Sequence, residues 1–340
     1  MKESLNIAIA GATGYVGIEL IKILCKHPNA KIIYLCATKS IGKTIKSFDK
    51  SIKKKLPKIS NLKNIEWSKV NIIFTALPNG EAQKISKKIP KNIKLIDLSG
   101  DFRLSDLNLY KKYYKINHHA KNLIKKSIYS ITEFSRKKLP NYNIISCPGC
   151  YPTSIQLPLL PLIKAKLVKT DKIIIDSKSG YSGAGRKIEK KLKNKNFFKY
   201  FSAYGVGNHK HTPEINQELS KIAKKKIYVN FTPHLIPVYR GILSTIYLDI
   251  LENCSAKKIY MFLKKYHKNN FFVKVSKFNT AIGTEGVLNT NFCNISICKG
   301  TDEKKIIIIS AIDNLIKGAS GQAVQNMNVA YKLKENLGLI

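Results

Sequence analysis

Three glycines near the start of the chain constrain its fold more than any other feature. They lie in the run GATGYVG at residues 11–17, after the apolar run SLNIAIA and before a segment whose apolar residues have helical spacing. Gly11, Gly14 and Gly17 recur at every third position, so the backbone can turn tightly, approach a pyrophosphate and pack a helix closely on a strand. This order predicts a dinucleotide-binding domain. A plain turn between a strand and a helix is the alternative.

Further apolar runs follow in the first third of the chain. Residues 31–40, 71–77 and 93–98 are predicted strands, and the run EAQKISKKI between the last two is a predicted helix. Alternation of short strands with helices predicts a parallel sheet with helices on its faces. The lysine-rich stretch 41–66 has poor periodicity, so we expect a surface excursion there.

The end of the second predicted strand bears on the choice of cofactor. An Asp or Glu at this place would hold the ribose 2′-hydroxyl of NAD, and none is present. Thr38, Lys39 and Ser40 instead offer hydrogen-bond donors and a positive charge, which suit the 2′-phosphate of NADP. The sequence therefore favours NADP over NAD.

A second motif places a cysteine where a thiol can react. Cys150 ends the run IISCPGC, so an apolar stretch and a Pro-Gly turn lead into a predicted helix. A helix N-terminus favours anions, and a thiol placed there ionises below its free pKa of about 8.5. We therefore predict a nucleophile. The alternative is a small buried residue in a tight turn.

Seven cysteines occur, and only Cys147 and Cys150 have CxxC spacing. A thioredoxin-like redox pair and a strand-to-helix turn both fit this spacing. A zinc site would need a second such pair, and the sequence has none. The start of the chain lacks a signal-peptide cleavage region, and no apolar run approaches the roughly 18 to 20 residues of a membrane span. We expect a cytoplasmic protein with reduced thiols and no membrane partner.

The run KIIIDSKSGYSGAGR, from residue 172, predicts a strand followed by a loop with three glycines. In such a loop Arg186 can pair with an anion while the small residues leave room for it, which describes a substrate clamp. A flexible connector is the alternative. Arg240, in the connection PVYRGI between two predicted strands, is a second candidate anion binder.

The run HKHTPEI at residues 209–215 predicts the start of a helix. Thr212 suits the N-cap and Glu214 suits the first turn. His209 and His211 precede this helix and face one side if the chain is extended there. An HxH pair can bind a metal, but no third ligand cluster is apparent, so we predict no metal site. General acid or base work needs only one histidine, and a structural hydrogen bond at the helix entry is the alternative.

The last third of the chain has a different pattern from the first. Strands are predicted at 227–236, 242–250, 271–278, 291–298 and 305–312, with one helix at 256–267 between them. Strands separated by few helices predict a mixed, largely antiparallel sheet. Residues 313–333 form a glycine-containing loop and a closing helix, which we expect to pack back on the first domain.

The formal net charge is +39, which in itself is typical of a protein that binds nucleic acid. Only four of the 60 basic residues are arginines, namely Arg103, Arg136, Arg186 and Arg240, and the lysines are scattered along the whole chain. Recognition of phosphates and bases prefers arginine. We therefore interpret the lysine excess as codon drift and expect no nucleic-acid partner, with a basic nucleic-acid-binding protein kept as the alternative.

In this order, the motifs resemble those of the N-acetyl-gamma-glutamyl-phosphate reductases. The resemblance covers nearly the whole chain and rests on GATGYVG at 11–17, ALPNG at 76–80, DLSGDFRL at 97–104, CPGCYPT at 147–153, SKSGYSGAGR at 177–186, HKHTPEI at 209–215, FTPHLIPVYRGIL at 231–243 and KGASGQAVQNMN at 317–328. It implies an α/β fold with a Rossmann-type NADP-binding domain over 1–148, completed by a C-terminal helix within 313–340. It also implies an inserted α+β catalytic and dimerisation domain over 149–312, and a homo-oligomer, either dimer or tetramer.

The resemblance also implies an activity. An acyl phosphate, N-acetyl-L-glutamyl 5-phosphate, would react with the Cys150 thiolate, and the resulting thioester would accept a hydride from NADPH to give the semialdehyde of arginine biosynthesis. A histidine of the HKHTPEI run would act as acid and base; we favour His209, because His211 adjoins the helix cap. Reductases of aspartyl or aminoadipyl phosphate use the same chemistry and remain alternatives.

The resemblance assigns residues to two kinds of binding site. Substrate contacts are expected from Arg103, Ser179, Arg186, Glu214 and Arg240. Cofactor contacts are expected from Gly11, Thr13, Gly14, Tyr15, Val16, Gly17, Thr38, Lys39, Ser40, Pro78, Ser182, Gly183 and Asn326. The sequence departs from the family pattern at Cys147, Ser154 and Asn79, where Asn, a small residue and His are usual. Cys147 raises the option of a disulfide with Cys150, and Asn79 removes any role of a histidine at that place.

Overall fold

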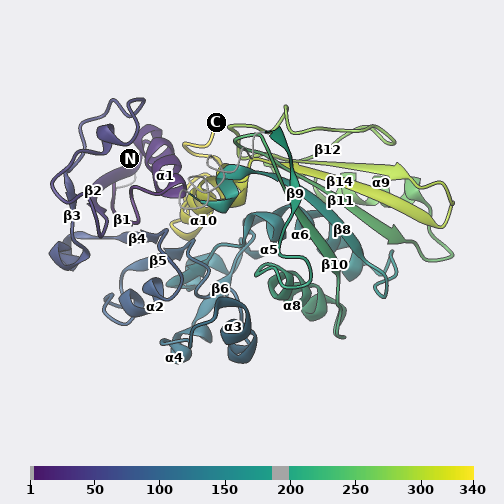
Figure 1. Cartoon of the computed structure of the whole chain (residues 1–340), viewed down its shortest axis with the longest axis horizontal. Helices are drawn as coiled ribbons and strands as arrows, with labels where there is room; N and C mark the ends of the chain where they lie inside the picture. The colour runs from purple at the N-terminus through teal and green to yellow at the C-terminus, as the bar shows by residue number, and fades with distance from the viewer. Residues whose placement is uncertain (1–3, 186–198) are drawn as a thin grey trace. The chain divides into compact units, whose positions relative to one another are not determined.

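The computed structural model describes residues 4–185 and 199–340. The chain divides into two compact units (Figure 1). Unit 1 comprises Met1–Pro148 and Ala319–Ile340, and unit 2 comprises Gly149–Gly318. Along the described residues, no helix has both the length and the apolar character needed to cross a lipid bilayer.

Unit 1 is built on a sheet with the strand order β3-β2-β1-β4-β5-β7-β6, in which every pairing is parallel. Its strands are β1 (Leu5–Ala10), β2 (Ala30–Cys36), β3 (Ile59–Ser60), β4 (Ile72–Thr75), β5 (Lys94–Asp97), β6 (Ser127–Tyr129) and β7 (Ile144–Ser146). From β1 the chain moves outward to β2 and β3, and then returns to place β4 on the other side of β1. The gap between β1 and β4 is therefore a topological switch point, where open α/β sheets bind ligands.

Helices cover both faces of this sheet. They are α1 (Tyr15–Lys26), α2 (Glu81–Ser86), α3 (Leu107–Tyr114), α4 (Lys121–Ile124), α5 (Thr132–Ser135) and α10 (Gly321–Ala330). Along β1, Ile7 and Ile9 join one buried cluster with residues of α1 and α10, while Ala8 and Ala10 join another with Ala82 of α2. This alternation follows from the two-residue period of a strand. In Figure 1 the yellow helix α10 lies beside the purple helix α1, and the two are in contact.

Unit 2 is built on a mixed sheet with the strand order β12-β13-β14-β11-β8-β10-β9. Its strands are β8 (Ile174–Gly180), β9 (Ser202–Ala203), β10 (Asn230–Ile236), β11 (Ile242–Asp249), β12 (Val273–Val275), β13 (Cys293–Lys299) and β14 (Lys305–Ile312). The pairs β8–β10 and β12–β13 are parallel, and the other four pairs are antiparallel.

Among the described residues of unit 2, three α-helices pack together, namely α6 (Cys150–Lys164), α8 (Thr212–Ala223) and α9 (Ala256–Tyr266). Helix α6 contacts β11, β14 and both other helices, so it is the central helix of the unit. Its residues from Tyr151 to Ile163 are all buried. On β8 and β11, buried residues alternate with partly or fully exposed ones, so one face of the sheet packs on the helices while the other has exposed apolar side chains.

The predicted fold class is confirmed: a parallel Rossmann-type sheet and a mixed, mainly antiparallel sheet lie in one chain. Two local predictions beside candidate site residues differ from the structure. Strand β2 ends at Cys36, so Thr38, Lys39 and Ser40 follow the strand instead of closing it. Helix α8 begins at Thr212, and the residue at its N-cap is His211 instead of Thr212. With Thr212 as the first helical residue, Pro213 is the second, and it still lies in the first turn, where its missing N–H leaves no helix hydrogen bond unmade.

Candidate active site

Cys150 is the first residue of helix α6, as predicted, and it is partly exposed. Gly149 is the N-cap residue with extended backbone, and its carbonyl oxygen accepts hydrogen bonds from the backbone N–H and the Oγ1 of Thr153, at 3.0 Å each. The amides of the first helical turn are therefore held beside the cysteine. A helix N-terminus with a partly exposed thiol is the environment of a reactive cysteine.

The imidazole of His211 packs directly on the backbone of Gly149. A Cβ atom at position 149 would overlap His211 Nε2, so only glycine permits this approach. Glu214, one helical turn into α8, accepts a hydrogen bond at 2.8 Å from the Gly149 N–H, and it is fully buried. The predicted substrate contact Glu214 therefore acts, in this structure, on the peptide that precedes the nucleophile.

His209 lies in an aromatic cage. Its ring makes edge contacts with Tyr151, Tyr204 and Phe231, with centroids 5.6, 5.3 and 5.5 Å away. Burial, assisted by the nearby charge of Lys210, lowers the pKa of His209 to about 4. The imidazole is therefore neutral at neutral pH.

The tautomer of His209 follows from one hydrogen bond. Its Nδ1 accepts from the backbone N–H of His211 at 3.1 Å, so in the neutral ring the proton is on Nε2. Burial, and with it the charge of a Cys150 thiolate, raises the pKa of Tyr204, which keeps that hydroxyl protonated. The cysteine and the aromatic cage of His209 thus belong to one cluster within unit 2.

Arg240 lies in the same unit, where strand β8 ends beside the β10–β11 connection. A Cβ atom at Gly180 would lie 2.7 Å from the backbone nitrogen of Arg240, so this close approach requires glycine. The guanidinium Nη1 donates to Asp313 Oδ2 at 3.1 Å and to Asn289 Oδ1 at 2.6 Å. Arg186, the other predicted clamp residue, lies outside the described residues.

Residues at the end of β8 complete this part of unit 2. Asn314 Nδ2 donates to Ser182 Oγ at 2.9 Å, and a Cβ atom at Gly183 would lie 3.0 Å from Ser179 Oγ and 3.6 Å from Asn314 Nδ2. Ser179 and Ser182 are both buried. Sequence reasoning missed Asp313, Asn314 and Gly318; for Asp313 and Asn314 the signal available was their place directly after the end of a predicted strand.

In unit 1, the glycine turn lies at the carboxyl end of β1. Gly11 has a φ of +89°, and a Cβ atom there would overlap the carbonyl oxygen of Ala76, just beyond β4. A Cβ atom at Gly17 would overlap the carbonyl oxygen of Gly11. The turn therefore needs glycine at both positions, and it directs the N-terminus of α1 towards the switch point. The other predicted cofactor contacts of unit 1 lie in this turn or just after β2 and β4, namely Thr13, Gly14, Tyr15, Val16, Thr38, Lys39, Ser40 and Pro78.

Two residues of unit 1 that were predicted to contact ligands form hydrogen bonds within the unit. Asn326 is fully buried; its Oδ1 accepts from Ser130 and Thr132, and its Nδ2 donates to Cys147 Sγ at 3.6 Å. Arg103 is also buried, and its Nε donates to the carbonyl oxygen of Cys147 at 2.8 Å. Both contacts hold the end of β7 in place, and the ligand contacts predicted for Asn326 and Arg103 stay predictions.

Cys147 differs from Cys150 in its surroundings. It is fully buried in unit 1, and burial raises the pKa of its thiol to about 12. Neither cysteine forms a disulfide in the described structure. Cys147 is therefore a protonated core thiol at neutral pH, and Cys150 is the candidate nucleophile.

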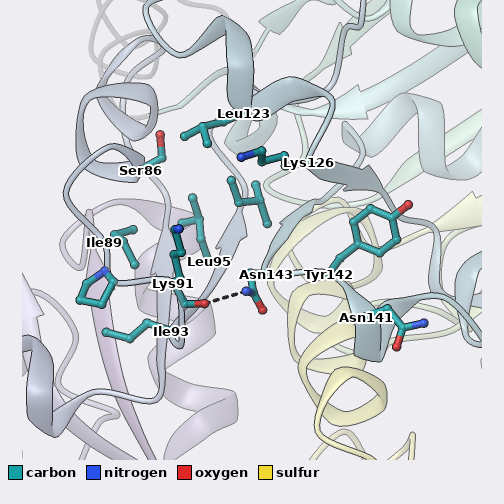
Figure 2. A pocket seen from close by; sticks show the side chains of 12 residues that line it. Ser86, Ile89, Lys91, Ile93, Leu95, Leu123, Lys126, Asn141, Tyr142 and Asn143 are labelled. Carbon is teal, nitrogen blue, oxygen red and sulfur yellow. Dashed lines mark hydrogen bonds between the residues drawn. The ribbon is translucent and has the colours of Figure 1, made fainter.

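A cavity of about 430 Å³ opens elsewhere in unit 1 (Figure 2). Ile89, Leu95 and Leu123 line it, and Asn143 Nδ2 donates to the carbonyl oxygen of Lys91 at its edge. Its lining contains neither the glycine turn nor any candidate catalytic residue. Along the described ranges, no three His, Cys, Asp or Glu side chains gather as a potential metal site.

Comparisons with known proteins agree with this division of the chain. The family model for the NAD-binding domain of semialdehyde dehydrogenases matches residues 6–142, and the model for their dimerisation domain matches residues 150–314. The N-acetyl-gamma-glutamyl-phosphate reductase of Ehrlichia canis is 43% identical over 100% of this chain and 98% of its own length. The probable chloroplastic reductase of Oryza sativa is 41% identical over 99% of this chain and 81% of its own length.

Solved structures support the fold. Aspartate semialdehyde dehydrogenase II of Vibrio cholerae aligns with a TM-score of 0.73 over 97% of this chain and 99% of that chain, at 18% identity. The two family models, the sequence identity over the full length and the two-sheet architecture lead to one conclusion. The chain binds a nicotinamide cofactor and belongs to the N-acetyl-gamma-glutamyl-phosphate reductases, a family of acyl-phosphate-reducing semialdehyde dehydrogenases.

Proposed function

We propose that this protein reduces N-acetyl-L-glutamyl 5-phosphate to N-acetyl-L-glutamate 5-semialdehyde and phosphate, with Cys150 as the nucleophile and NADPH as the reductant. The observation that carries the proposal is the position of Cys150 at the start of α6, with His211 packed on the preceding glycine. Full-length similarity to reductases named for this substrate supports the choice of acyl group.

The residues of unit 1 fit a dinucleotide. The turn at Gly11 has space only for hydrogen where a Cβ would be, and the first turn of α1 contains no acidic residue that would oppose a pyrophosphate. Thr38 and Lys39 are exposed beyond β2, where a 2′-phosphate would be recognised, which supports NADP. Unit 1 is accordingly the cofactor domain, and unit 2 is the catalytic domain.

The chemistry of unit 2 follows from the cysteine. The Cys150 thiolate attacks the acyl carbon, the C–O bond to phosphate breaks, and phosphate leaves with the bonding electron pair. The amides at the start of α6 stabilise the oxyanion formed on the way. The nicotinamide, when bound, supplies a hydride to the acyl carbon. Collapse of the thiohemiacetal then returns the electron pair to sulfur and releases the aldehyde.

His209 is the proposed acid and base. Its neutral ring has a proton on Nε2, held there by the bond from the His211 N–H to Nδ1, and can donate it to the developing oxyanion. His211 contacts Gly149 and is the N-cap residue of α8, so it fixes the position of His209 relative to Cys150. Arg240 and Ser179 are the proposed partners of the anionic groups of the substrate.

The open face of the unit 2 sheet supports self-association. Tyr247 of β11 pairs in register with Ile174 of β8 and Ile307 of β14, which forms an apolar row across three strands. Tyr247 and Ile174 are 42% and 48% exposed. We propose that this row is covered by a second copy of the chain, so that the protein is at least a dimer.

The proposal is tested in the reverse direction of the reaction. With phosphate and NADP, the purified protein should oxidise N-acetylglutamate semialdehyde much faster than aspartate semialdehyde, and NAD should replace NADP poorly. Cys150→Ser should abolish the activity and leave NADPH binding, followed by fluorescence, unchanged. A fully active Cys150→Ser variant would exclude the nucleophile, and equal use of both aldehydes would exclude the substrate.

A further inference from the structure

Asp313, the residue directly after β14, is fully buried and accepts four hydrogen bonds through its carboxylate. Oδ1 accepts from the backbone N–H groups of Leu315 and Ile316 at 2.8 and 3.1 Å. Oδ2 accepts from the backbone N–H of Asn289 at 2.7 Å and from Arg240 Nη1 at 3.1 Å. A buried carboxylate with this many donors is rigidly held, and its charge balances that of the partly buried Arg240.

The backbone of Asp313 is tied to the nucleophile. Its carbonyl oxygen accepts from the Gly318 N–H at 2.9 Å, five residues on, within the π-helical turn Ile316–Ser320. Gly318 packs on Cys150, because a Cβ atom on Gly318 would lie 2.7 Å from Cys150 Cβ. Single π-helical turns are rare and occur frequently at functional sites. One residue thus holds both an arginine and the turn that contacts the cysteine.

The guanidinium of Arg240 is aligned from one end. Both Asp313 Oδ2 and Asn289 Oδ1 accept from the same nitrogen, Nη1, and the Cζ atom lies 5.5 Å from the centre of the Tyr239 ring. Because the group is planar, fixing Nη1 and one face fixes the direction of its other donors. The side chain of Arg240 is 12% exposed, so the orientation is set inside the protein and not by solvent.

Asn314 extends the arrangement to the loop after β8. Its Oδ1 accepts from the Gly241 N–H at 2.7 Å, and its Nδ2 donates to Ser182 Oγ. Asp313 and Asn314, the two residues directly after β14, therefore fix two segments. One is the β10–β11 connection, which contains Arg240, and the other is the loop after β8, which contains Ser182.

We propose that Asp313 is a positioning residue of the reductase: its side chain orients Arg240 towards an anionic group of the acyl phosphate, while its carbonyl fixes the turn that packs on Cys150. The inference rests on the proposed function, because it takes Arg240 as a substrate contact. It accounts for a buried acidic residue that the chemistry at Cys150 does not itself use.

The test is a double-mutant cycle between Asp313→Asn and Arg240→Lys. Asparagine keeps the size of the side chain and removes the charge that holds the guanidinium, so Asp313→Asn should raise KM for N-acetylglutamate semialdehyde about tenfold and change kcat little, with KM for NADP unaltered. In the Arg240→Lys background, Asp313→Asn should raise KM for the semialdehyde less than about twofold, because the guanidinium that Asp313 orients is already absent. Equal costs in both backgrounds would overturn the proposal.

A second variant avoids the buried carboxylate. Asn289 is exposed and has a φ of +60°, a conformation that glycine adopts freely, so Asn289→Gly removes the Oδ1 acceptor of Arg240 without backbone strain. It should raise KM for the semialdehyde by about threefold to tenfold at an unchanged unfolding temperature. If Asp313→Asn fails to fold, the double-mutant cycle of Asn289→Gly with Arg240→Lys is the test of whether Arg240 must be oriented. If the rises in KM for the semialdehyde are additive in that cycle, the proposal is contradicted.

Two controls separate this inference from the proposed function. The rate of alkylation of Cys150 by iodoacetamide should be the same in Asp313→Asn as in the unmodified protein, because the carbonyl bond to Gly318 is retained. If the unmodified protein does not use the semialdehyde, the proposed function fails. If the unmodified protein uses it and Asp313→Asn has the same KM, only the role of Asp313 fails.

Discussion

Among single residues, His209 shows how burial sets a chemical role. Three aromatic rings surround its imidazole, and the resulting desolvation lowers its pKa to about 4. A histidine of this kind is neutral through the physiological range and can donate only through the nitrogen that carries its proton. The motif HKHTPEI cannot convey this, because the rings of Tyr151, Tyr204 and Phe231 come from three other segments of the chain.

The low pKa of His209 predicts a dependence of stability on pH. In the unfolded chain His209 is protonated below its pKa of about 6.5, whereas in the folded chain it is protonated only below about pH 4. The free energy of unfolding therefore falls as the pH falls through this window. At pH 5 the cost is about 2 kcal/mol. In His209→Asn, whose Oδ1 can accept the bond from the His211 N–H, the free energy of unfolding should therefore change by about 2 kcal/mol less between pH 7 and pH 5.

Urea unfolding at the two pH values measures this difference. Between pH 7 and pH 8 the pH dependence of the two proteins should differ by only about 0.2 kcal/mol, since His209 is neutral in the folded state and mostly neutral in the unfolded state there. An identical loss of stability at pH 5 in the variant and the unmodified protein would contradict the argument.

The candidate site could be predicted in part. The position of Cys150 at the start of a helix could be predicted from the sequence, because a Pro-Gly turn before a helix is a local signal. The ligand contacts predicted for Glu214, Arg103 and Asn326 from motifs stay predictions, and the structure adds that their polar atoms hydrogen-bond to Gly149, Cys147 and Ser130. Such partners are distant in the sequence, and no local pattern reveals them.

Among the secondary-structure elements, the turn between β1 and α1 combines two requirements that can be separated. Gly11 is needed for folding, because of its positive φ and the nearby Ala76 carbonyl. Gly14 has a φ of −74°, and a Cβ atom there would lie 3.5 Å from the Gly11 carbonyl oxygen, an ordinary contact. We therefore expect Gly14 to serve cofactor binding, by leaving the backbone at the start of α1 accessible to a pyrophosphate.

Two alanine variants should distinguish these requirements. Gly11→Ala should lower the free energy of unfolding of the cofactor-free protein by about 3 kcal/mol, through strain and overlap. Gly14→Ala should leave that value within about 0.5 kcal/mol and weaken NADPH binding about tenfold, or about 1.4 kcal/mol. Urea unfolding and a fluorescence titration measure the two effects. Equal stability of both variants would show that the turn tolerates a side chain at position 11.

The elements themselves were predictable to the extent that their periodicity is local. The glycine turn lies where the pattern placed it, and each predicted strand overlaps an observed one, but the short strands β3, β6 and β9 were not predicted. The predicted strand at 271–278 shortens to β12, Val273–Val275, because a parallel partner is available only at Cys293–Ile295. The π-helical turn at Ile316–Ser320 has no sequence signature, since it depends on the carbonyl of Asp313.

For the molecule as a whole, the net charge of +39 and the exposed apolar row of unit 2 lead to opposite expectations about salt. A protein that binds nucleic acid releases counterions from the phosphates, so its binding weakens steeply as salt is added. Two copies that join through Tyr247 and Ile174 repel each other through their like charges, and salt screens that repulsion. The direction of the salt effect therefore separates the two kinds of association.

We predict that the dissociation constant of the dimer falls when NaCl is raised from about 50 mM to about 300 mM, over which range the screening length shortens to well below 10 Å. Tyr247→Lys should produce monomers at both salt concentrations, because it places a charge in the middle of the apolar row. Met261→Lys is the matched control, since Met261 is 56% exposed but lies on helix α9, away from that row. Sedimentation velocity measures all three proteins. A dimer that weakens with salt, or one that Met261→Lys disrupts as strongly as Tyr247→Lys, would place the contact elsewhere, because hydrophobic association of like-charged copies can only gain from screening.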